Sequence, residues 1–395
     1  MTDLTLEQPP EATPPQPTEA QPQAMAAQSV AGGRVTVKAN RIGYSGQTGS
    51  VYKIWLLNIF LTVITLGIYS FWGKTRMRRY LTGSFRLGGD NFEYTGTGKE
   101  LFIGFLKVLP VVIALYAAAF FLPHQLVMVI YLPILYLFPV AIFMAMRYRL
   151  NRLTWRGIRA RLTGSPFRFG GFALWRMFLN IVSFGILIPA SDIATYGYMA
   201  NRAGIGNVRA KFDGKVAALI RTHIVTLILC VVSILGTVGA VMGIAYLSVS
   251  SGTGDLGRAA SQVADRFGRM QAMSAAAPVG IILSIFVVIM IRSYYHAALM
   301  REKMRGLTLG KIRFKCTATG FDVLKLRLGN LLIIVFTLGL GFPVVIQRRM
   351  RFMADKLIVG GDLDDAQMMQ AARESGAAGE GLDDIFGIDA DLGIG

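Results

Sequence analysis

Four long apolar stretches dominate the hydrophobic pattern of the chain. They cover residues 101–123, 125–146, 222–250 and 277–291, and the last extends past Arg292 to about residue 299. A helix of about 20 such residues crosses a bilayer core of about 30 Å. The pattern therefore predicts two transmembrane helical hairpins, one over 101–146 and one over 216–300. In the second hairpin we expect an outer loop over 249–275 that carries a short surface helix at 256–271.

Three shorter apolar segments each centre on a turn of Thr or Ser, Leu or Phe, and Gly. The turns are Thr65-Leu66-Gly67, Ser183-Phe184-Gly185 and Thr337-Leu338-Gly339. The 14 residues from Lys53 to Gly67 make about 21 Å of helix, which is too short for two crossings. Each segment forms either a re-entrant hairpin or a short span followed by an amphipathic helix on the inner surface. Flanking bases favour the re-entrant form, in which we expect protein or water around the turn.

The same segments indicate an internal repeat. Gly46, Gly67 and Gly96 recur 118 residues later at Gly164, Gly185 and Gly214, and Gly320 and Gly339 begin a third copy. Apolar repeats are typical of multi-pass membrane proteins. The pattern predicts a disordered tail at 1–33, a first repeat at 34–150, a second at 151–303, a partial third at 304–360 and an acidic disordered tail at 361–395.

Short pieces with alternating residues lie between the apolar segments and predict β-strands. They cover residues 34–46, 85–96, 156–164, 208–214 and 309–320. Because all of them adjoin basic clusters, we expect small cytoplasmic sheets that cap the membrane side. The expected fold class is an all-α polytopic membrane protein with internal repeats, re-entrant or broken helical hairpins and short cytoplasmic strands.

The charge distribution agrees with a membrane location. Of the 395 residues, 53% are hydrophobic and 16% are charged, against roughly 25% charged in soluble proteins. Residues 34–360 carry 40 bases and 10 acids, a net charge of +30. The basic clusters alternate with the apolar stretches, so the positive-inside rule places the clusters and both termini in the cytoplasm. Anionic phospholipids are the expected partners, and nucleic acid is not, because no basic stripe with stacking aromatics occurs outside the spans.

A family resemblance rests on the first turn and the residues after it. The turn with its trailing Arg76, Arg78, Arg79 and Tyr80, followed by the segment from Phe92 to Phe102, resembles the YjgN-like family of bacterial inner-membrane proteins, a domain of unknown function. The resemblance covers most of residues 35–360. It implies a multi-pass protein of the bacterial inner membrane, and it brings no activity or catalytic residue. A departure from the family pattern, Phe71-Trp72-Gly73-Lys74 after the turn, affects the entry into the following helix.

Sequence motifs for catalysis and metal binding are weak. The segment from Gly96 to Lys99 resembles a phosphate loop, but it continues with Glu100 and lacks the first glycine of the pattern. The three histidines, at 124, 223 and 296, have no Cys or carboxylate at metal-ligand spacing. We therefore expect no enzyme activity, no metal ion and no cofactor.

Polar and ionisable residues at membrane depth are the remaining candidates for function, because they are costly there. Asp192 is the acid within a turn-centred arm, and we expect Arg176 or Arg221 to pair with it; alternatively it is a hydrated interfacial acid. Arg221 and His223 lie inside a span, where snorkelling and core packing are the alternative interpretations. The other candidate cavity or binding residues are those of the turns, which alternatively cap a helix without any ligand: Thr65, Gly67, Ser183, Gly185, Thr337 and Gly339.

Two functions are compatible with these features. The first is a transporter or channel-like protein that binds a small anionic solute or lipid, because helix N-termini at the turns attract anions. The second is a non-catalytic scaffold that organises lipids, a protein partner or further copies of itself. The copies recur directly and are therefore parallel, unlike the inverted repeats of many alternating-access transporters. The substrate, energy source and oligomeric state are open.

Overall fold

The structure, a computed structural model, describes residues 39–121, 123–250 and 258–361. The two predicted tails lie outside this part of the chain, apart from Gly361. The helices form five helical hairpins in chain order, three short and two long. The short pairs are α2 (Thr48–Ile64) with α3 (Ser70–Gly83), α6 (Pro166–Val182) with α7 (Ile188–Ala200), and α10 (Gly320–Phe336) with α11 (Phe342–Lys356). The long pairs are α4 (Gly98–Phe121) with α5 (His124–Asn151), and α8 (Ala217–Ser250) with α9 (Arg258–Gly306).

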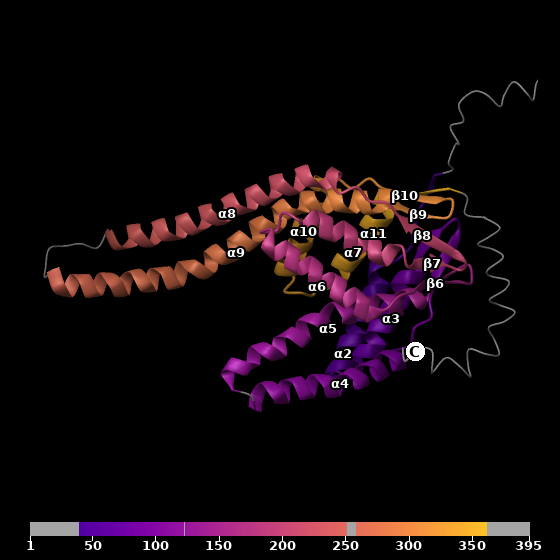
Figure 1. Ribbon diagram of the computed structural model, residues 1–395, viewed down its shortest axis with the longest axis horizontal. Helices are drawn as coiled ribbons and strands as arrows, with labels where there is room; N and C mark the ends of the chain where they lie inside the picture. The colour runs from indigo at the N-terminus through magenta and orange to yellow at the C-terminus, as the bar shows by residue number, and fades with distance from the viewer. Residues whose placement is uncertain (1–38, 122, 251–257, 362–395) are drawn as a thin grey trace, which may run out of the picture. The chain divides into compact units, whose positions relative to one another are not determined.

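Four helices are long and apolar enough to cross a membrane, as the hydrophobic pattern predicts. They contain the stretches Gly98–Ala118, Leu132–Asn151, Ala217–Gly243 and Pro278–Gly306. The surface helix expected at 256–271 is helical from Arg258, but it is not a separate short element in an outer loop over 249–275, because α9 continues without interruption to Gly306. Residues 251–257 of the expected loop lie outside the described part of the chain. At 1.5 Å per residue its 49 residues extend over about 74 Å, well beyond a bilayer core of about 30 Å. Figure 1 shows α8 and α9 lying side by side.

The fold is mostly helical, as expected, but it is not all-α, because eleven short strands among the described residues join in one antiparallel sheet. The strands are β1 (Ala39–Arg41), β2 (Gly43–Tyr44), β3 (Phe85–Leu87), β4 (Asp90–Tyr94), β5 (Leu153–Trp155), β6 (Ile158–Leu162), β7 (Ala203–Ile205), β8 (Val208–Phe212), β9 (Leu307–Leu309), β10 (Ile312–Cys316) and β11 (Leu357–Gly360). From β2 to β11, neighbours in the chain are neighbours in the sheet. The sheet is curled, and its two end strands are β1, which pairs with β11, and β2, which pairs with β3. Since only Ile42 separates β1 from β2, one extended segment closes the sheet.

The order of the strands places all five helical hairpins at one end of the sheet. Consecutive connections between antiparallel strands alternate between the two ends. Here each helical hairpin joins β2 to β3, β4 to β5, β6 to β7, β8 to β9 or β10 to β11, and each intervening connection is a tight β-turn. These turns have two residues and use positive φ at Gly88, Gly89, Gly157, Gly206 and Gly310. The small separate sheets expected from the sequence are therefore parts of one sheet.

The inside of the curled sheet is an apolar core. It contains Leu87, Trp155, Ile158, Ile312 and Val359, each at most 7% exposed, together with partly buried residues of the other strands. Because side chains alternate along a strand, the intervening residues face outward. Eight of those outward residues are exposed bases: Arg41, Arg86, Arg159, Arg161, Arg209, Lys211, Arg313 and Lys315. The predicted basic cap is thus the outer face of this sheet.

The three predicted turns share one backbone conformation. Their central residues Leu66, Phe184 and Leu338 have φ of 49°, 49° and 50°, and the glycines that follow have φ of 96°, 83° and 88°. Each glycine N–H donates to a carbonyl five residues earlier, at 2.7, 2.7 and 2.8 Å. Positive φ at the glycine costs no steric energy, which explains the residue choice. The turn thus satisfies much of its own backbone, and it reverses the chain between two helices.

The recurring glycines outside the turns have a packing role. A Cβ atom on Gly46, Gly96 or Gly214 would overlap the aromatic ring two residues earlier, which belongs to Tyr44, Tyr94 or Phe212 respectively. Gly164 differs, because a Cβ atom there would meet the side chain of Arg202. In three places, therefore, the glycine lets the last aromatic residue of a strand fold back over the chain.

Asp322 links the start of α10 to the end of α11. Its Oδ2 accepts the backbone N–H of Thr319 at 2.9 Å and the Nζ of Lys356 at 2.8 Å. In return, the hydroxyl of Thr319 accepts the backbone N–H of Asp322 at 3.2 Å, which completes a capping box. These contacts to its charged form lower the pKa of Asp322 to about 2.

This shift predicts a pH-dependent contribution to stability. Because the pKa in the folded protein lies below the unfolded value, the contribution is complete above pH ~4 and is lost as the pH falls through 2. We expect Asp322→Asn to lower the free energy of unfolding by about 1 kcal/mol at pH 7. Thermal unfolding in detergent between pH 2 and 7 should show this difference from the wild type closing toward pH 2. Asp355→Asn, an exposed position on α11, is the control. A difference that stays constant down to pH 2 would contradict the assignment.

Candidate polar site between α7, α8 and α9

Helix α7 packs on the pair formed by α8 and α9, close to the sheet. Ile193 of α7 joins Leu219 of α8 and Tyr295, Ala298 and Leu299 of α9 in one buried cluster. Pro189 in the first turn of α7 suits a helix start, because proline lacks the N–H that would go unpaired there. This packing carries polar residues of three helices into a largely apolar environment.

Asp192 is bound by a tyrosine and not by an arginine. The hydroxyl of Tyr295, which is fully buried, donates to Oδ2 of Asp192 at 2.7 Å. The expected pairing with Arg176 or Arg221 is wrong. Arg176 instead lies 5.3 Å from the ring of Phe172, and Arg221 is exposed on α8. A buried tyrosine hydroxyl needs an acceptor, and α7 supplies one here.

His223 ties α8 to the second turn. It is 1% exposed, and its Nε2 donates to the backbone carbonyl of Gly185 at 2.9 Å, because that oxygen can only accept. The imidazole meets the ring of Tyr295 edge-on, with centroids 5.0 Å apart. Within the described part of the chain, its Nδ1 is buried without a hydrogen-bond partner. His223 therefore packs in the core, as one interpretation of the sequence has it, while it also holds the turn of the hairpin.

Two cations flank this group of residues. The guanidinium of Arg292 lies 4.8 Å from the centroid of the Tyr295 ring, and Nζ of Lys303 lies 5.1 Å from that of Tyr196. Lys303 also interacts electrostatically with Asp192. We name Asp192, His223, Arg292, Tyr295 and Lys303 the α7–α9 polar cluster. It combines one carboxylate, one imidazole and two cations near the start of the candidate span in α8 and the end of that in α9, where a further anion would find positive charge.

The turn hydroxyls act as caps, as the sequence predicts. The hydroxyls of Thr65, Ser183 and Thr337 accept the backbone N–H groups of Tyr69, Leu187 and Gly341 at 2.9, 3.2 and 2.7 Å. The sequence predicts protein or water around the turns, and the described part of the chain does not supply the protein. Leu66, Phe184 and Leu338 are 94, 89 and 92% exposed. Because the turn pairs much of its own backbone, it does not need a surrounding protein to satisfy these groups.

The nine candidate residues do not form a single site. Gly185, Asp192 and His223 meet around Tyr295. Thr65 and Gly67 belong to the turn between α2 and α3. Thr337 and Gly339 belong to the turn between α10 and α11. The sequence interpretation missed Tyr295 as a partner. The signal was the segment Arg292-Ser-Tyr-Tyr-His296, a polar run inside an apolar helix.

Metal-binding geometry is not evident in the described residues. No three of their His, Cys, Asp or Glu side chains come together around a common point. Cys230 and Cys316 are both buried and unpaired.

These features define a mostly helical membrane protein with four candidate spans and a curled antiparallel sheet. The chain belongs to a family described as bacterial protein of unknown function (DUF898), whose model matches residues 39–385. It is similar to the inner membrane protein YjgN of Salmonella typhimurium, with 42% identity over 65 residues. It is also similar to the inner membrane protein YjgN of Escherichia coli strain K12, with 33% identity over 70 residues. These matches support an inner-membrane location.

The matched segments are short. They span 16% of this chain and of the Salmonella protein, and 18% of this chain and of the Escherichia coli protein. No solved structure is similar to this chain at a significant level. The family and its relatives thus agree with the resemblance inferred from the sequence, and they bring no activity with them.

Proposed function

We propose that this protein binds an anionic solute or an anionic phospholipid and acts as a transporter or channel-like protein, without enzymatic activity. The observation that carries the proposal is the contact between the turn at Gly185 and the α7–α9 polar cluster. Buried ionisable residues in spans are costly and mark functional sites by default. Helices that end within the membrane place their termini at such sites in known transporters. The two cations of the cluster supply attraction for an anion.

In this proposal the three short hairpins are re-entrant: they enter and leave the membrane on the same side. Helices α2 and α3 have 17 and 14 residues, about 26 and 21 Å, and both ends of the hairpin return to the sheet. A bilayer core of about 30 Å is longer than either arm. Exposed apolar turns at the far end suit insertion into lipid. In this arrangement the sheet, the basic clusters and both termini are cytoplasmic. The conformation that the three turns share supports the proposal that the chain contains an internal repeat.

A flux assay tests the proposal. We expect proteoliposomes with the full chain to take up one or more members of a panel of anionic metabolites or fluorescent phosphatidylglycerol. Asp192→Asn should change the rate at least about tenfold, because it alters the charge of the cluster that holds the turn. Asp355→Asn removes the same charge at an exposed position of α11 and should leave the rate unchanged. Wild-type protein that moves no member of the panel, or equal rates in both variants, would reject the transport role.

The alternative function is a non-catalytic scaffold, which the exposed bases on the outer face of the sheet favour. Anionic lipids, a protein partner or a second copy of the chain are its proposed ligands. In the same assay a scaffold gives no flux. Crosslinking in cells distinguishes it further, since removal of the acidic tail, residues 361–395, should change the recovered partners while Asp192→Asn should not.

A further inference from the structure

Two arginines flank a glycine on the outer face of the sheet. In the registers of the strands, Arg161 of β6 lies opposite Gly204 of β7, and Gly204 lies opposite Arg209 of β8. Residues directly opposite one another project to the same face. Because Gly204 has no side chain, nothing on β7 fills the space between the two exposed arginines. A Cβ atom at Gly204 would lie only 2.6 Å from the carbonyl oxygen of Val208, so this position must remain glycine.

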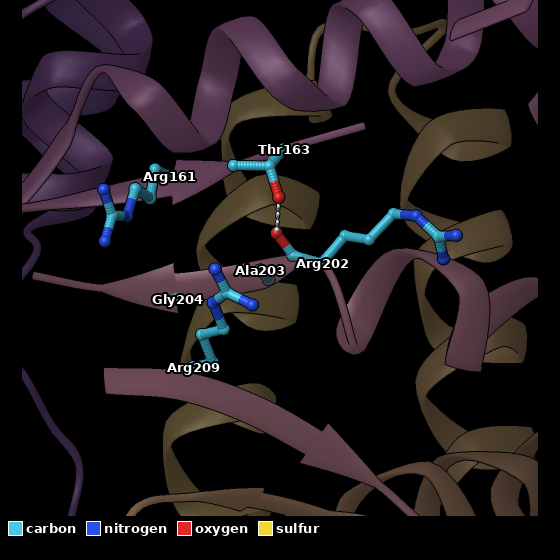
Figure 2. A pocket seen from close by; sticks show the side chains of 6 residues that line it. All are labelled: Arg161, Thr163, Arg202, Ala203, Gly204 and Arg209. Carbon is cyan, nitrogen blue, oxygen red and sulfur yellow. Dashed lines mark hydrogen bonds between the residues drawn. The ribbon is translucent and has the colours of Figure 1, made fainter. Parts of the chain in front are cut away.

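A pocket of about 90 Å³ lies at this place, with room for several water molecules and hence for a small oxyanion. Its lining consists of Arg161, Thr163, Arg202, Ala203, Gly204 and Arg209. Figure 2 shows the Arg202 side chain extending away from the other two arginines. Arg202 is engaged elsewhere, because its Nη1 donates to the carbonyl of Tyr198 at 2.9 Å and its guanidinium lies 3.6 Å from the centroid of that ring. The hydroxyl of Thr163, which lines the pocket, donates to the carbonyl of Arg202 at 3.1 Å.

Within the part of the chain that the structure describes, the two remaining arginines lack a compensating acid. A comparable row on β4, β5 and β6 places Glu93, Thr154 and Arg159 in register, so there an acid stands at one end and a base at the other. In the row of Gly204 both ends are basic. Among the residues that the structure describes, neither Arg161 nor Arg209 hydrogen-bonds to or forms an ion pair with a carboxylate. An anion between them would remove the unfavourable interaction of two like charges.

The spacing suits a phosphate group. Neighbouring strands lie about 4.8 Å apart, so residues on the two outer strands of a row start about 10 Å apart. Two arginine side chains of that separation can lean inward and each offer a fork of N–H donors to one tetrahedral oxyanion. We propose that Arg161 and Arg209 bind a phosphate group over Gly204, carried by a phospholipid headgroup or by free phosphate. The site is separate from the α7–α9 polar cluster and does not rest on the transport proposal.

A thermal-shift titration of the full chain in a phosphate-free maltoside detergent tests this site. Inorganic phosphate and phosphatidylglycerol are added in separate series, with sodium chloride at equal ionic strength as the control for screening. The variant carries Arg161→Gln and Arg209→Gln. The matched control carries Arg313→Gln and Lys315→Gln, which remove the same charge from exposed positions of β10. Arg209→Lys keeps the positive charge but loses the planar set of guanidinium N–H donors. It therefore separates the electrostatic attraction for phosphate from the geometry of the hydrogen bonds.

We expect the wild type to be stabilised by one or both ligands, with at least about tenfold weaker apparent affinity in the double variant and a change below about twofold in the control. Arg209→Lys should give an intermediate affinity. A response to phosphatidylglycerol alone identifies a headgroup as the source, and a response to inorganic phosphate identifies a soluble ligand. No response in the wild type, or equal loss in the double variant and its control, would overturn the proposal.

Discussion

Replacement of Tyr295 by alanine is expected to lower the free energy of unfolding by about 3–5 kcal/mol, the range for large buried aromatic residues. The side chain is fully buried, its ring contacts His223, and its hydroxyl is the donor to Asp192. Removal would leave a cavity and a half-buried carboxylate without its donor. Thermal unfolding of the purified protein in detergent, followed by circular dichroism, measures the change.

Two further variants separate the causes. Tyr295→Phe keeps the ring and removes the hydroxyl, so it should cost about 1–3 kcal/mol. Tyr116→Ala is the control, because Tyr116 of α4 is 76% exposed and its loss should matter little. An unfolding temperature for Tyr295→Ala equal to that of Tyr116→Ala would show that the buried cluster does not contribute to stability.

Replacement of Gly306 by alanine is expected to have a similarly large effect. Gly306 ends α9, and its carbonyl accepts the N–H of Asp213 at 2.9 Å where β8 leads toward α8. A Cβ atom there would lie 2.7 Å from the carbonyl oxygen of Asp213 and 2.9 Å from its carbonyl carbon. Both atoms belong to the backbone, so they cannot swing aside. We expect a loss of about 3 kcal/mol, from overpacking and the strained hydrogen bond.

Gly236→Ala is the matched control for this substitution. Gly236 lies within α8, and a Cβ atom there would meet nothing within 4 Å. Alanine is the better helix former, so the change should be neutral or slightly stabilising. The unfolding temperatures of the two variants in the same detergent provide the comparison. If Gly306→Ala unfolded at the wild-type temperature, the close approach of α9 to the sheet would not exist as described.

Local features of this fold could be predicted from the sequence. The four candidate spans follow from the length of the apolar stretches, which needs no knowledge of neighbouring segments. The turns at Gly67, Gly185 and Gly339 follow from local chemistry, because a glycine accommodates positive φ and a hydroxyl caps the next helix. The strand pieces were found, but their short partners β5, β7, β9 and β11 were not, because three or four residues carry too little periodicity to detect.

The candidate site was predicted only in part for a related reason. Asp192 and His223 were found because an ionisable residue in an apolar helix is visible in the sequence. Their common neighbour Tyr295 lies 103 residues beyond Asp192 in the chain. A tyrosine in a span is compatible with core packing or interfacial anchoring, so its hydroxyl does not single it out before the helices are placed together.

The sequence alone determined that this is a membrane protein with four helices long and apolar enough to cross a bilayer, three sharply turned hairpins and an excess of bases beside them, because each of these depends on residues near one another in the chain. Only the tertiary structure decided that the strands close into one sheet, that Tyr295 and not an arginine binds Asp192, and that Arg161 and Arg209 face each other across Gly204. These three depend on strand register and helix packing between distant segments, and that information is absent from local hydrophobic periodicity.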